Sequence, residues 1–334
     1  MSGDFLQLMA ESSRERVRLA KLERSEGQLL EIAAARPKAP VLERDPGGFD
    51  LFAELKLRSP AMGQLRTTDE NVAKRVTDYA RAGAAAVSVL TEPSRFDGSL
   101  THLEQATAAL TPLGIPAMRK DFLVDRYQVV EAHAAGASGV LVILRMLPPD
   151  ELRELIACTL DLGLFALLEA FDEQDVELAR QLVAEFQHRA YPHAPREAER
   201  GGRPGDAPPR KPTHLKDDSA QVAGEYSNTV KMPAPLLLVG VNCRDLATLQ
   251  VVPARLEQLV DALPTAVPRV AESGVTSAED AHRLADAGYD FALVGSALMQ
   301  GGDPQALATA LLAGGRSGVV DRLARERRGT SNAM

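Results

Sequence analysis

The stretch Phe52-Ala-Glu-Leu-Lys-Leu-Arg-Ser-Pro60 is an apolar run that carries two opposite charges, Glu54 and Lys56. Side chains two residues apart on an extended strand point to the same face. A carboxylate and an ammonium on a buried strand are costly unless they pair or serve a ligand. Ser59-Pro60 ends the strand, because proline cannot continue a central ladder. The stretch therefore predicts a buried strand that ends in a cluster of charge.

From Leu51 onward one unit recurs: a short apolar strand with polar residues at its end, a helix, and a glycine suited to the left-handed cap that closes a helix. The apolar runs are nearly continuous, as is typical of parallel strands covered on both faces. Eight strands alternating with helices predict a (β/α)8 barrel. An open doubly wound sheet is the alternative, and the polar residues after nearly every strand favour the barrel. The expected strands span 51–56, 86–91, 115–119, 139–144, 164–169, 235–241, 268–272 and 291–295.

Several segments lie outside this repeat. Residues 4–35 have helical spacing of apolar residues, with Ser12-Ser13 as a possible capping break, and the proline-containing 36–48 reads as a linker. The segment 190–233, between the fifth and sixth strands, is rich in Pro, Gly, Arg and Asp, which predicts a disordered or loosely held insertion at the N-terminal face of the barrel. An inert insertion is favoured over a partner-binding or regulatory loop.

The end of the chain is expected to form a last helix over 303–313, followed by a basic stretch, 322–328, that reads as a solvated helix end or a frayed terminus. The predicted organisation is an N-terminal helical extension and linker over 1–50, a catalytic barrel over 51–316 that contains the insertion, and a C-terminal tail over 317–334.

Composition narrows the class of protein. The chain has 334 residues, 45% of them hydrophobic, which suits one large α/β barrel. A formal net charge of −8 argues against general binding to nucleic acid or to anionic membranes. Cys158 and Cys243 form neither a disulfide framework nor a zinc spacing, which is typical of a cytoplasmic protein. We find no signal-peptide pattern and no apolar run of about 18 residues that would span a membrane.

Charged and polar residues follow the strands of the expected barrel at the end where such barrels carry their active sites. Each has an ordinary interpretation: Lys120 could pair with Asp121, Glu169 could cap the next helix with Asp172, and Asn242 could be a turn residue. Five strands that bring glutamates, lysines, an asparagine and an arginine to one end nevertheless predict an active site. The candidate residues are Glu54, Lys56, Ser59, Lys120, Glu169, Asn242, Arg244, Glu272 and Ser273.

Glycines after the last two strands predict a phosphate site. Gly274 and Gly295 let backbone N–H groups approach an oxyanion closely. Ser296 is expected to open a short helix whose N-terminus favours a phosphate, and Lys56 lies close across the barrel. Phosphate sites at these two strands recur in barrels of this kind.

No metal-binding, Rossmann or Walker pattern accompanies these residues. The six histidines fall in expected helices or in the insertion. Two ammonium groups beside carboxylates therefore predict cofactor-free acid–base chemistry on a phosphorylated small molecule.

Six motifs follow one another along the expected strands: Glu54-Leu-Lys56 with Ser59-Pro60, Ser88-Val-Leu-Thr-Glu-Pro93, Arg119-Lys-Asp-Phe122, Tyr127-Gln128, Val241-Asn-x-Arg-Asp245 and Glu272-Ser-Gly274. Together they resemble those of the indole-3-glycerol phosphate synthase family. The resemblance covers about 51–187 and 234–310, with an N-terminal helical extension of the family's kind.

The resemblance implies the ring-closing step of tryptophan biosynthesis. That reaction converts 1-(2-carboxyphenylamino)-1-deoxyribulose 5-phosphate to indole-3-glycerol phosphate and releases CO2 and water. Lys120 would protonate the ketone oxygen during ring closure. Lys56, Glu54 and Glu169 would supply the acid and base for dehydration, and the sequence leaves their division of labour open.

The resemblance also implies how the substrate is held. Asn242, Glu272 and Ser273 would position the sugar hydroxyls and the amine. Arg244 would bind the anthranilate carboxylate as a planar donor fork. Ser59, Phe96 and Phe122 complete the implied binding set, with the two rings flanking the aromatic part of the substrate.

Two departures from the family pattern stand out. Where the family commonly has Ser-Pro-Ser-Lys-Gly, this chain has Ser59-Pro-Ala-Met-Gly63, which is expected to raise KM or slow loop closure. Cys243 stands where asparagine is common, but its side chain should point away from those of Asn242 and Arg244.

Two other functions compete with the synthase. An isomerase of tryptophan or histidine biosynthesis would share the phosphate-binding barrel but would not need this set of glutamates and lysines. A barrel recruited as a binding or scaffold protein would use the insertion, yet Lys120 and Glu169 are both present. The sequence leaves open the oligomeric state and whether another enzyme of the pathway passes substrate to this chain.

Overall fold

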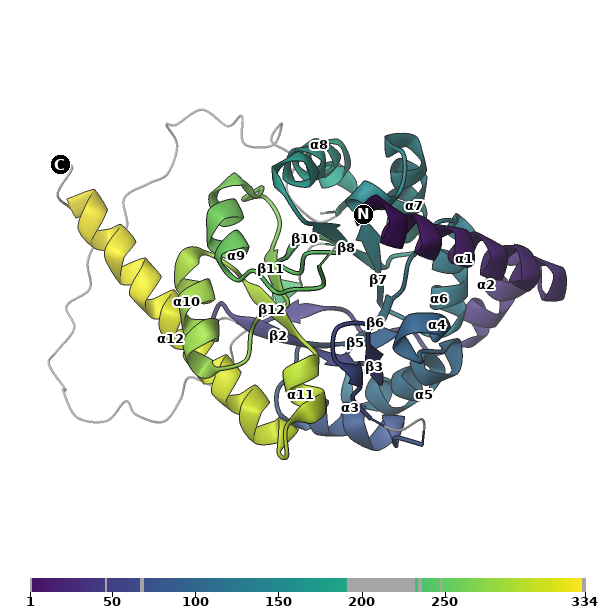
Figure 1. Ribbon diagram of the computed structural model, residues 1–334, viewed down its shortest axis with the longest axis horizontal. Helices are drawn as coiled ribbons and strands as arrows, with labels where there is room; N and C mark the ends of the chain where they lie inside the picture. Colours follow the sequence, from purple (N-terminus) through teal and green to yellow (C-terminus); the bar gives the residue numbers. More distant parts are fainter. Residues whose placement is uncertain are drawn as a thin grey trace, which may run out of the picture.

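A closed barrel of eight parallel strands forms the centre of the computed structural model (Figure 1), which describes residues 2–45, 47–66, 69–190, 232–233, 236–246 and 248–331. Neighbouring strands of the barrel follow the order β10-β11-β12-β2-β5-β6-β7-β8, and the last strand pairs with the first. The predicted barrel is therefore confirmed, and the alternative of an open sheet is excluded. Each expected strand is present, with its ends within two residues of those predicted. The strands are β2 (Asp50–Leu55), β5 (Ala86–Leu90), β6 (Ala117–Lys120), β7 (Gly139–Ile143), β8 (Phe165–Ala170), β10 (Leu237–Asn242), β11 (Arg269–Glu272) and β12 (Phe291–Val294).

Helices connect the strands and cover the outside of the barrel. Gly83, Gly136 and Gly288 follow three of them with positive φ angles of 93°, 88° and 120°, as expected for glycines that close helices. The helices are α3 (Val72–Arg81), α4 (Pro93–Phe96), α5 (Leu100–Leu110), α6 (Arg126–Ala134), α7 (Pro149–Asp161), α8 (Glu173–Ala190), α9 (Ala254–Leu259), α10 (Ala278–Ala287), α11 (Ser296–Gln300) and α12 (Pro304–Ser331).

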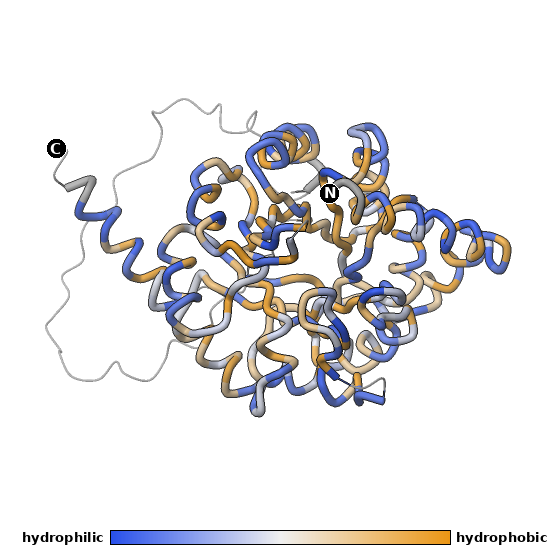
Figure 2. The backbone as a smooth tube through the Cα atoms, in the orientation of Figure 1, coloured by the Kyte–Doolittle hydropathy of each residue, from blue (hydrophilic) through white to orange (hydrophobic). Residues whose placement is uncertain are grey.

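Apolar side chains fill the barrel and the layer between strands and helices. Figure 2 shows the apolar strands inside and the more polar helix faces outside. Inside the barrel, the ring of Phe52 meets those of Phe165 and Phe291 edge-on, with centroids 6.0 and 5.2 Å away. The barrel is therefore a packed core below its mouth.

The N-terminal extension is helical, as predicted, but its break lies elsewhere. Helix α1 (Ser2–Glu23) runs straight through Ser13, whose buried hydroxyl donates to the Phe122 carbonyl at 2.5 Å instead of capping a helix. Helix α2 (Glu26–Ala35) begins after Ser25, which forms a capping box with Gln28. The predicted break at Ser12-Ser13 is therefore wrong, because Ser13 has a tertiary partner.

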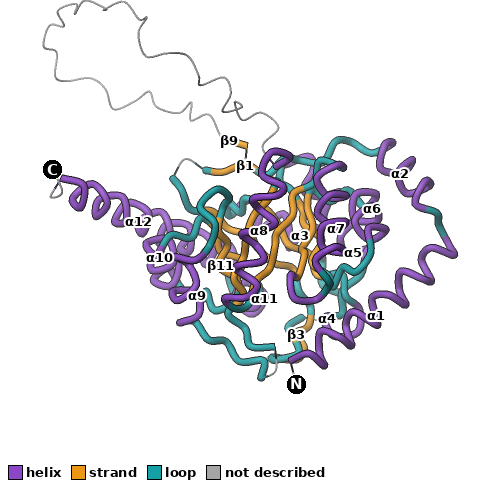
Figure 3. The backbone as a smooth tube through the Cα atoms, turned by 90° about the horizontal axis from the view of Figure 1, so that it is seen from above, coloured by secondary structure: helices purple, strands orange, loops and turns teal. Residues whose placement is uncertain are grey.

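Two small antiparallel sheets were not predicted. Strand β1 (Glu43–Arg44), within the expected linker, pairs with β9 (Met232–Pro233), and β3 (Arg58–Ser59) pairs with β4 (Gly63–Gln64). Figure 3 shows β1 and β9 at one end of the barrel and β3 at the other. Arg44 pairs with Asp290, just before β12, so β1 lies at the N-terminal end of the strands. Residues 191–231 lie outside the described part of the chain, so the predicted disorder of the insertion stays a prediction.

The last helix is longer than predicted. It continues from Pro304 to Ser331 instead of ending at 313, so the predicted boundary at 316/317 falls within it. Glycines at 314, 315 and 318 lie where α12 packs against its neighbours. A Cβ at Gly314 would collide with the backbone of Ala278 on α10, and one at Gly315 with the ring of Phe49. No helix within the described ranges is long and apolar enough to span a bilayer.

We predict that Gly314→Ala destabilises the protein by about 1–3 kcal/mol because the added methyl group overpacks the α10–α12 contact. Helix propensity alone would favour alanine by about 1 kcal/mol. Urea unfolding monitored by circular dichroism measures the difference. Gly302→Ala is the matched control, because its added Cβ would have no neighbour within 4 Å. A Gly314→Ala variant as stable as the parent would contradict the close approach.

Candidate active site

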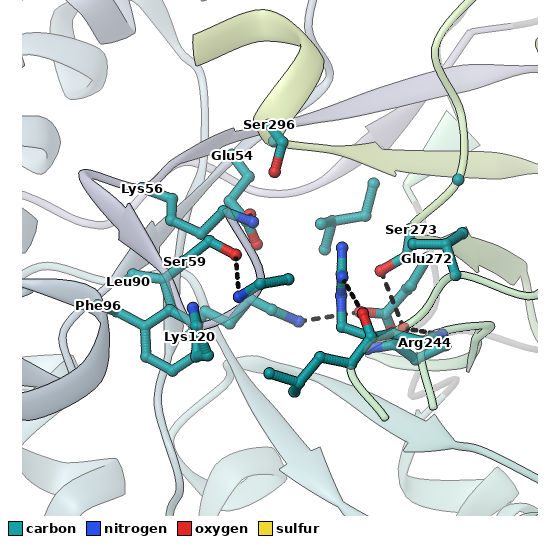
Figure 4. A pocket seen from close by; sticks show the side chains of 18 of the residues that line it. Glu54, Lys56, Ser59, Leu90, Phe96, Lys120, Arg244, Glu272, Ser273 and Ser296 are labelled. Atoms are coloured by element: carbon teal, nitrogen blue, oxygen red, sulfur yellow. Dashed lines mark hydrogen bonds and ion pairs between the residues drawn. The ribbon is translucent and has the colours of Figure 1, made fainter. Parts of the chain in front are cut away.

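All of the residues predicted from the sequence to bind or act on the substrate line one cavity of about 440 Å³ at the C-terminal ends of the strands. Figure 4 shows several of them pointing into the same space. Lys120 comes from β6, Glu169 from β8 and Glu272 from β11, so the parallel strands bring together residues far apart in the sequence.

Glu54 and Lys56 form a buried ion pair, with Lys56 Nζ 2.7 Å from Glu54 Oε1. Their side chains are 3% and 12% exposed, and both face the cavity, as strand alternation predicts. Burial alone would raise the pKa of Glu54, but Lys56 and Lys120 lower it below its ordinary value. The two lysines therefore favour the ionised form of Glu54.

Lys120 lies between two carboxylates. Its Nζ is 2.9 Å from Glu272 Oε2 and 3.5 Å from Glu169 Oε1. Burial alone would lower the pKa of Lys120, but the surrounding carboxylates, Glu169 first, raise it above its ordinary value. Pairing of Lys120 with Asp121 is excluded as the alternative, because Asp121 binds Arg16 and Arg119 instead.

A hydrogen-bonded chain joins β8, β10 and the turn after β11. Asn242 Nδ2 donates to Glu169 Oε1 at 2.7 Å, and Ser273 Oγ donates to Asn242 Oδ1 at 2.9 Å. Glu169 thus takes part in the site, while the helix-capping role falls to Asp172, which accepts from Gln174 N. The alternative of Asn242 as a turn residue holds in part, because its Oδ1 also accepts from the backbone N–H of residue 244 at 2.9 Å.

Burial shifts the pKa of Glu272 upward. Desolvation raises its pKa to about 8, Lys120 opposes the shift, and the neighbouring Glu169 adds to it. The cluster therefore brings two lysines and three carboxyl groups together in a buried space, and Glu272 is the carboxyl whose pKa this burial raises.

Aromatic and apolar side chains form the wall around the charged groups. The rings of Phe96 and Phe122 lie 6.1 Å apart at 40° to each other. Arg244 lines the cavity, and its Nη1 donates to the Leu249 carbonyl at 2.8 Å. The buried Cys243 packs in the core outside the barrel, so the prediction that its side chain points away from the site is confirmed.

The N-terminal helix contributes to the wall, which the sequence did not reveal. Phe5 and Leu6 of α1 line the cavity, and the Phe5 ring meets that of Phe122 edge-on at 5.9 Å. The apolar spacing of α1 indicated that one face packs, but not against what. Met62 lies between β3 and β4, in the loop whose sequence differs from the family pattern. It also lines the cavity and is 46% exposed.

The predicted phosphate residues Lys56, Gly274, Gly295 and Ser296 all line the cavity. Gly274 has a φ angle of 73°, and Gly295 precedes α11, which begins at Ser296 as expected. A Cβ at Gly295 would collide with the Glu54 carboxylate, so a larger residue there would displace Glu54. Figure 4 shows Ser296 near Glu54 and away from Phe96.

Among the side chains that the structure describes, no three His, Cys, Asp or Glu residues are grouped to hold a metal ion.

Comparison with known proteins identifies the family. The family model for indole-3-glycerol phosphate synthase matches residues 6–187 and 223–311. The chain belongs to the indole-3-glycerol phosphate synthase family. Residues 188–222, most of the insertion, fall outside the match.

Curated relatives extend the match over most of the chain. The chain is 35% identical to the indole-3-glycerol phosphate synthase of Micrococcus luteus over 307 residues, which cover 90% of this chain and 94% of the relative. It is 36% identical to that of a Nocardioides species over 269 residues, or 80% of this chain and 82% of the relative.

Solved structures share the fold at low identity. The 3-hexulose-6-phosphate synthase of Salmonella typhimurium matches with a TM-score of 0.51 and 12% identity, over 82% of this chain and 100% of its own. The thiamine phosphate pyrophosphorylase of Pyrococcus furiosus matches with a TM-score of 0.50 and 13% identity, over 82% of this chain and 98% of its own. These likenesses support the barrel fold alone.

The raised pKa of Glu272 leads to a pH-dependent stability. Between its ordinary value of 4.5 and about 8, the native state holds a proton that the unfolded chain has released. The stability contributed by protonated Glu272 at low pH is therefore lost as the pH rises through this window. Glu272→Gln keeps a neutral side chain, so we expect its melting temperature relative to the parent to improve between about pH 5 and about pH 9.

Differential scanning calorimetry at matched ionic strength measures this change. Glu104→Gln is the control, because the Glu104 side chain is 49% exposed on the outer surface. A difference between Glu272→Gln and the parent that stayed constant with pH would contradict the shift.

Proposed function

We propose that this chain closes the indole ring of indole-3-glycerol phosphate in the cavity described above, with Lys120 as the proton donor. As a member of its family the chain is a decarboxylating lyase of tryptophan biosynthesis. Its substrate is then 1-(2-carboxyphenylamino)-1-deoxyribulose 5-phosphate, and CO2 and water leave.

The observation that carries the assignment is the ammonium of Lys120 between Glu169 and Glu272, inside a largely apolar cavity. In ring closure, the aromatic carbon that bears the carboxylate attacks the ketone, and the ketone oxygen becomes an alkoxide that needs a proton. A charged lysine beside that oxygen stabilises the developing negative charge and donates the proton. Loss of CO2 then restores the aromatic ring.

Dehydration of the resulting alcohol needs a second acid and a base. Glu54, Lys56 and Glu169 are the groups in the cavity suited to these two roles. The Glu54–Lys56 pair, 2.7 Å apart, holds an acid and a base side by side.

Binding roles follow from where the other residues lie. Asn242 and Ser273, joined by a hydrogen bond, fit the sugar hydroxyls and the amine, and Arg244 fits the anthranilate carboxylate. The rings of Phe96 and Phe122 fit the aromatic part of the substrate. The other residues predicted to bind the substrate also line the cavity. They are Ser59 and the phosphate residues Lys56, Gly274, Gly295 and Ser296.

We predict that Lys120→Ala lowers kcat by at least about 10²–10⁴-fold, the usual contribution of a general acid. Product is measured by the fluorescence of indole-3-glycerol phosphate, with purified protein and substrate in the absence of metal or nucleotide. Lys74→Ala is the matched control, because Lys74 is 72% exposed on α3. Parent-like turnover by a Lys120→Ala variant with an unchanged circular dichroism spectrum would refute the assignment.

We predict that Ser296→Asp raises KM by more than about tenfold with little change in kcat, because a carboxylate there repels the substrate phosphate. Ser296→Ala should raise KM by about 10–10²-fold, since a hydrogen bond to a charged group is worth about 1.5–3 kcal/mol. Competition by inorganic phosphate gives an independent readout, with the inhibition constant rising in parallel. An unchanged KM in both variants would place the phosphate elsewhere.

A further inference from the structure

Asp121 lies directly after Lys120 and borders the same cavity, but its carboxylate is turned to Arg16, Thr91 and Arg119. The Asp121 carboxylate is fully buried. Arg16 of α1 donates two hydrogen bonds to this carboxylate, from Nη2 to Oδ1 at 2.7 Å and from Nη1 to Oδ2 at 2.9 Å. Thr91 Oγ1 donates to Oδ2 at 2.7 Å, and Arg119 Nη2 lies 3.1 Å from the same oxygen. Every donor in this set favours an ionised, fixed carboxylate.

The end of β6 depends on this carboxylate. On the β7 side, the ladder stops at the pairing of Arg119 with Val140. On the β5 side, the Lys120 carbonyl accepts from Thr91 N at 3.0 Å. The β6 ladder therefore ends at Lys120, and the side-chain contacts of Asp121 hold the chain where the sheet ends.

Helix α1 makes a second contact with the same segment. Ser13 lies one helical turn before Arg16 and donates to the Phe122 carbonyl at 2.5 Å. Gln128 Nε2 donates to Ser13 Oγ at 2.9 Å and so fixes the hydroxyl that makes this contact. One face of α1 thus reaches both residues that follow the lysine.

We propose that Arg16 is a positioning residue for Lys120, and that it acts through the buried carboxylate of Asp121. The proposal rests on the function proposed above, in which Lys120 is the proton donor. It gives the N-terminal extension a part in the reaction beyond covering the barrel.

The geometry explains why a distant arginine affects the chemistry. Lys120 Nζ is 2.9 Å from Glu272 and 3.5 Å from Glu169, so a small shift of the strand end moves the ammonium relative to both carboxylates and the substrate ketone. A misplacement of about 1 Å costs about 10²-fold in rate. Arg16 makes a bidentate pair of hydrogen bonds with Asp121, whereas the ammonium group of a lysine could not reproduce this planar, two-donor geometry.

A purely structural role for Arg16 predicts a different pattern. If the ion pair only docked α1 on the barrel, its loss would lower stability or displace Phe5 and Leu6 from the cavity wall, and KM would carry the effect. A positioning role lowers kcat and leaves KM nearly unchanged.

Steady-state kinetics of full-length Arg16→Ala, Arg16→Lys and Arg18→Ala separate the two roles. Arg18, on the same helix, is 60% exposed and pairs with Glu15, so Arg18→Ala should match the parent. We expect Arg16→Ala to lower kcat by about 10–10²-fold with KM within about threefold of the parent. Arg16→Lys should recover only part of the rate, and added methylguanidine should restore part of the activity of Arg16→Ala. If Arg16→Ala fails to fold, Arg16→Lys alone carries the comparison.

A double-mutant cycle tests the route through Asp121. Asp121→Asn and Arg16→Ala should lower kcat by similar factors, and the double variant should be no worse than either. Factors that multiply in the double variant, a parent-like kcat in folded Arg16→Ala, or an effect confined to KM would each overturn the proposal. Lys120→Ala, assayed alongside, keeps the failures apart: activity in that variant refutes the proposed function itself, whereas its inactivity beside an active Arg16→Ala refutes only the role of Arg16.

Discussion

Buried charge at the mouth of the barrel is the constraint on which the rest of the structure depends. An ammonium removed from water is tolerated only beside carboxylates and well-placed hydrogen bonds. Lys120 has Glu169 and Glu272, and Lys56 has Glu54. These partners come from strands far apart in the chain, so the closed sheet must hold its register for the charges to balance.

Two glycines make room for these carboxylates. A side chain at Gly240 would collide with the Glu272 carboxylate, and one at Gly295 would collide with that of Glu54. A strand interior that is otherwise packed with branched and aromatic residues therefore opens where an acid must be accommodated. At Glu272, burial both requires the room left by Gly240 and raises the pKa of the carboxyl group.

Strand alternation separates chemistry from anchoring. On β6, Lys120 faces the cavity, while Arg119 and Asp121 on either side of it join a network that reaches the N-terminal helix. After β10, Asn242 faces the cavity and Cys243 packs outside the barrel. Arg119 and Cys243, each next to a cavity residue, are thus buried without lining the cavity, because successive side chains point to opposite sides of the sheet.

The sequence by itself determined the eight strands, the barrel and the membership of the cavity. The repeat of strand and helix units, the apolar runs and the polar residues at strand ends are all local features of the sequence. Parallel strands of a barrel have their C-terminal ends on the same side, so residues at those ends come together. Glu54, Lys120, Glu169 and Glu272 could therefore be grouped before any coordinates.

Only the tertiary structure decided which partner each group takes. Lys120 turns to Glu272 and not to Asp121, and Ser13 binds the Phe122 carbonyl and not its own helix. Gly314 lies within α12, where it allows the close approach of α10. These choices depend on contacts between residues distant in the chain, where burial and close packing outweigh local preference. For the same reason the contribution of α1 to the cavity wall could not be predicted from the spacing of its apolar residues.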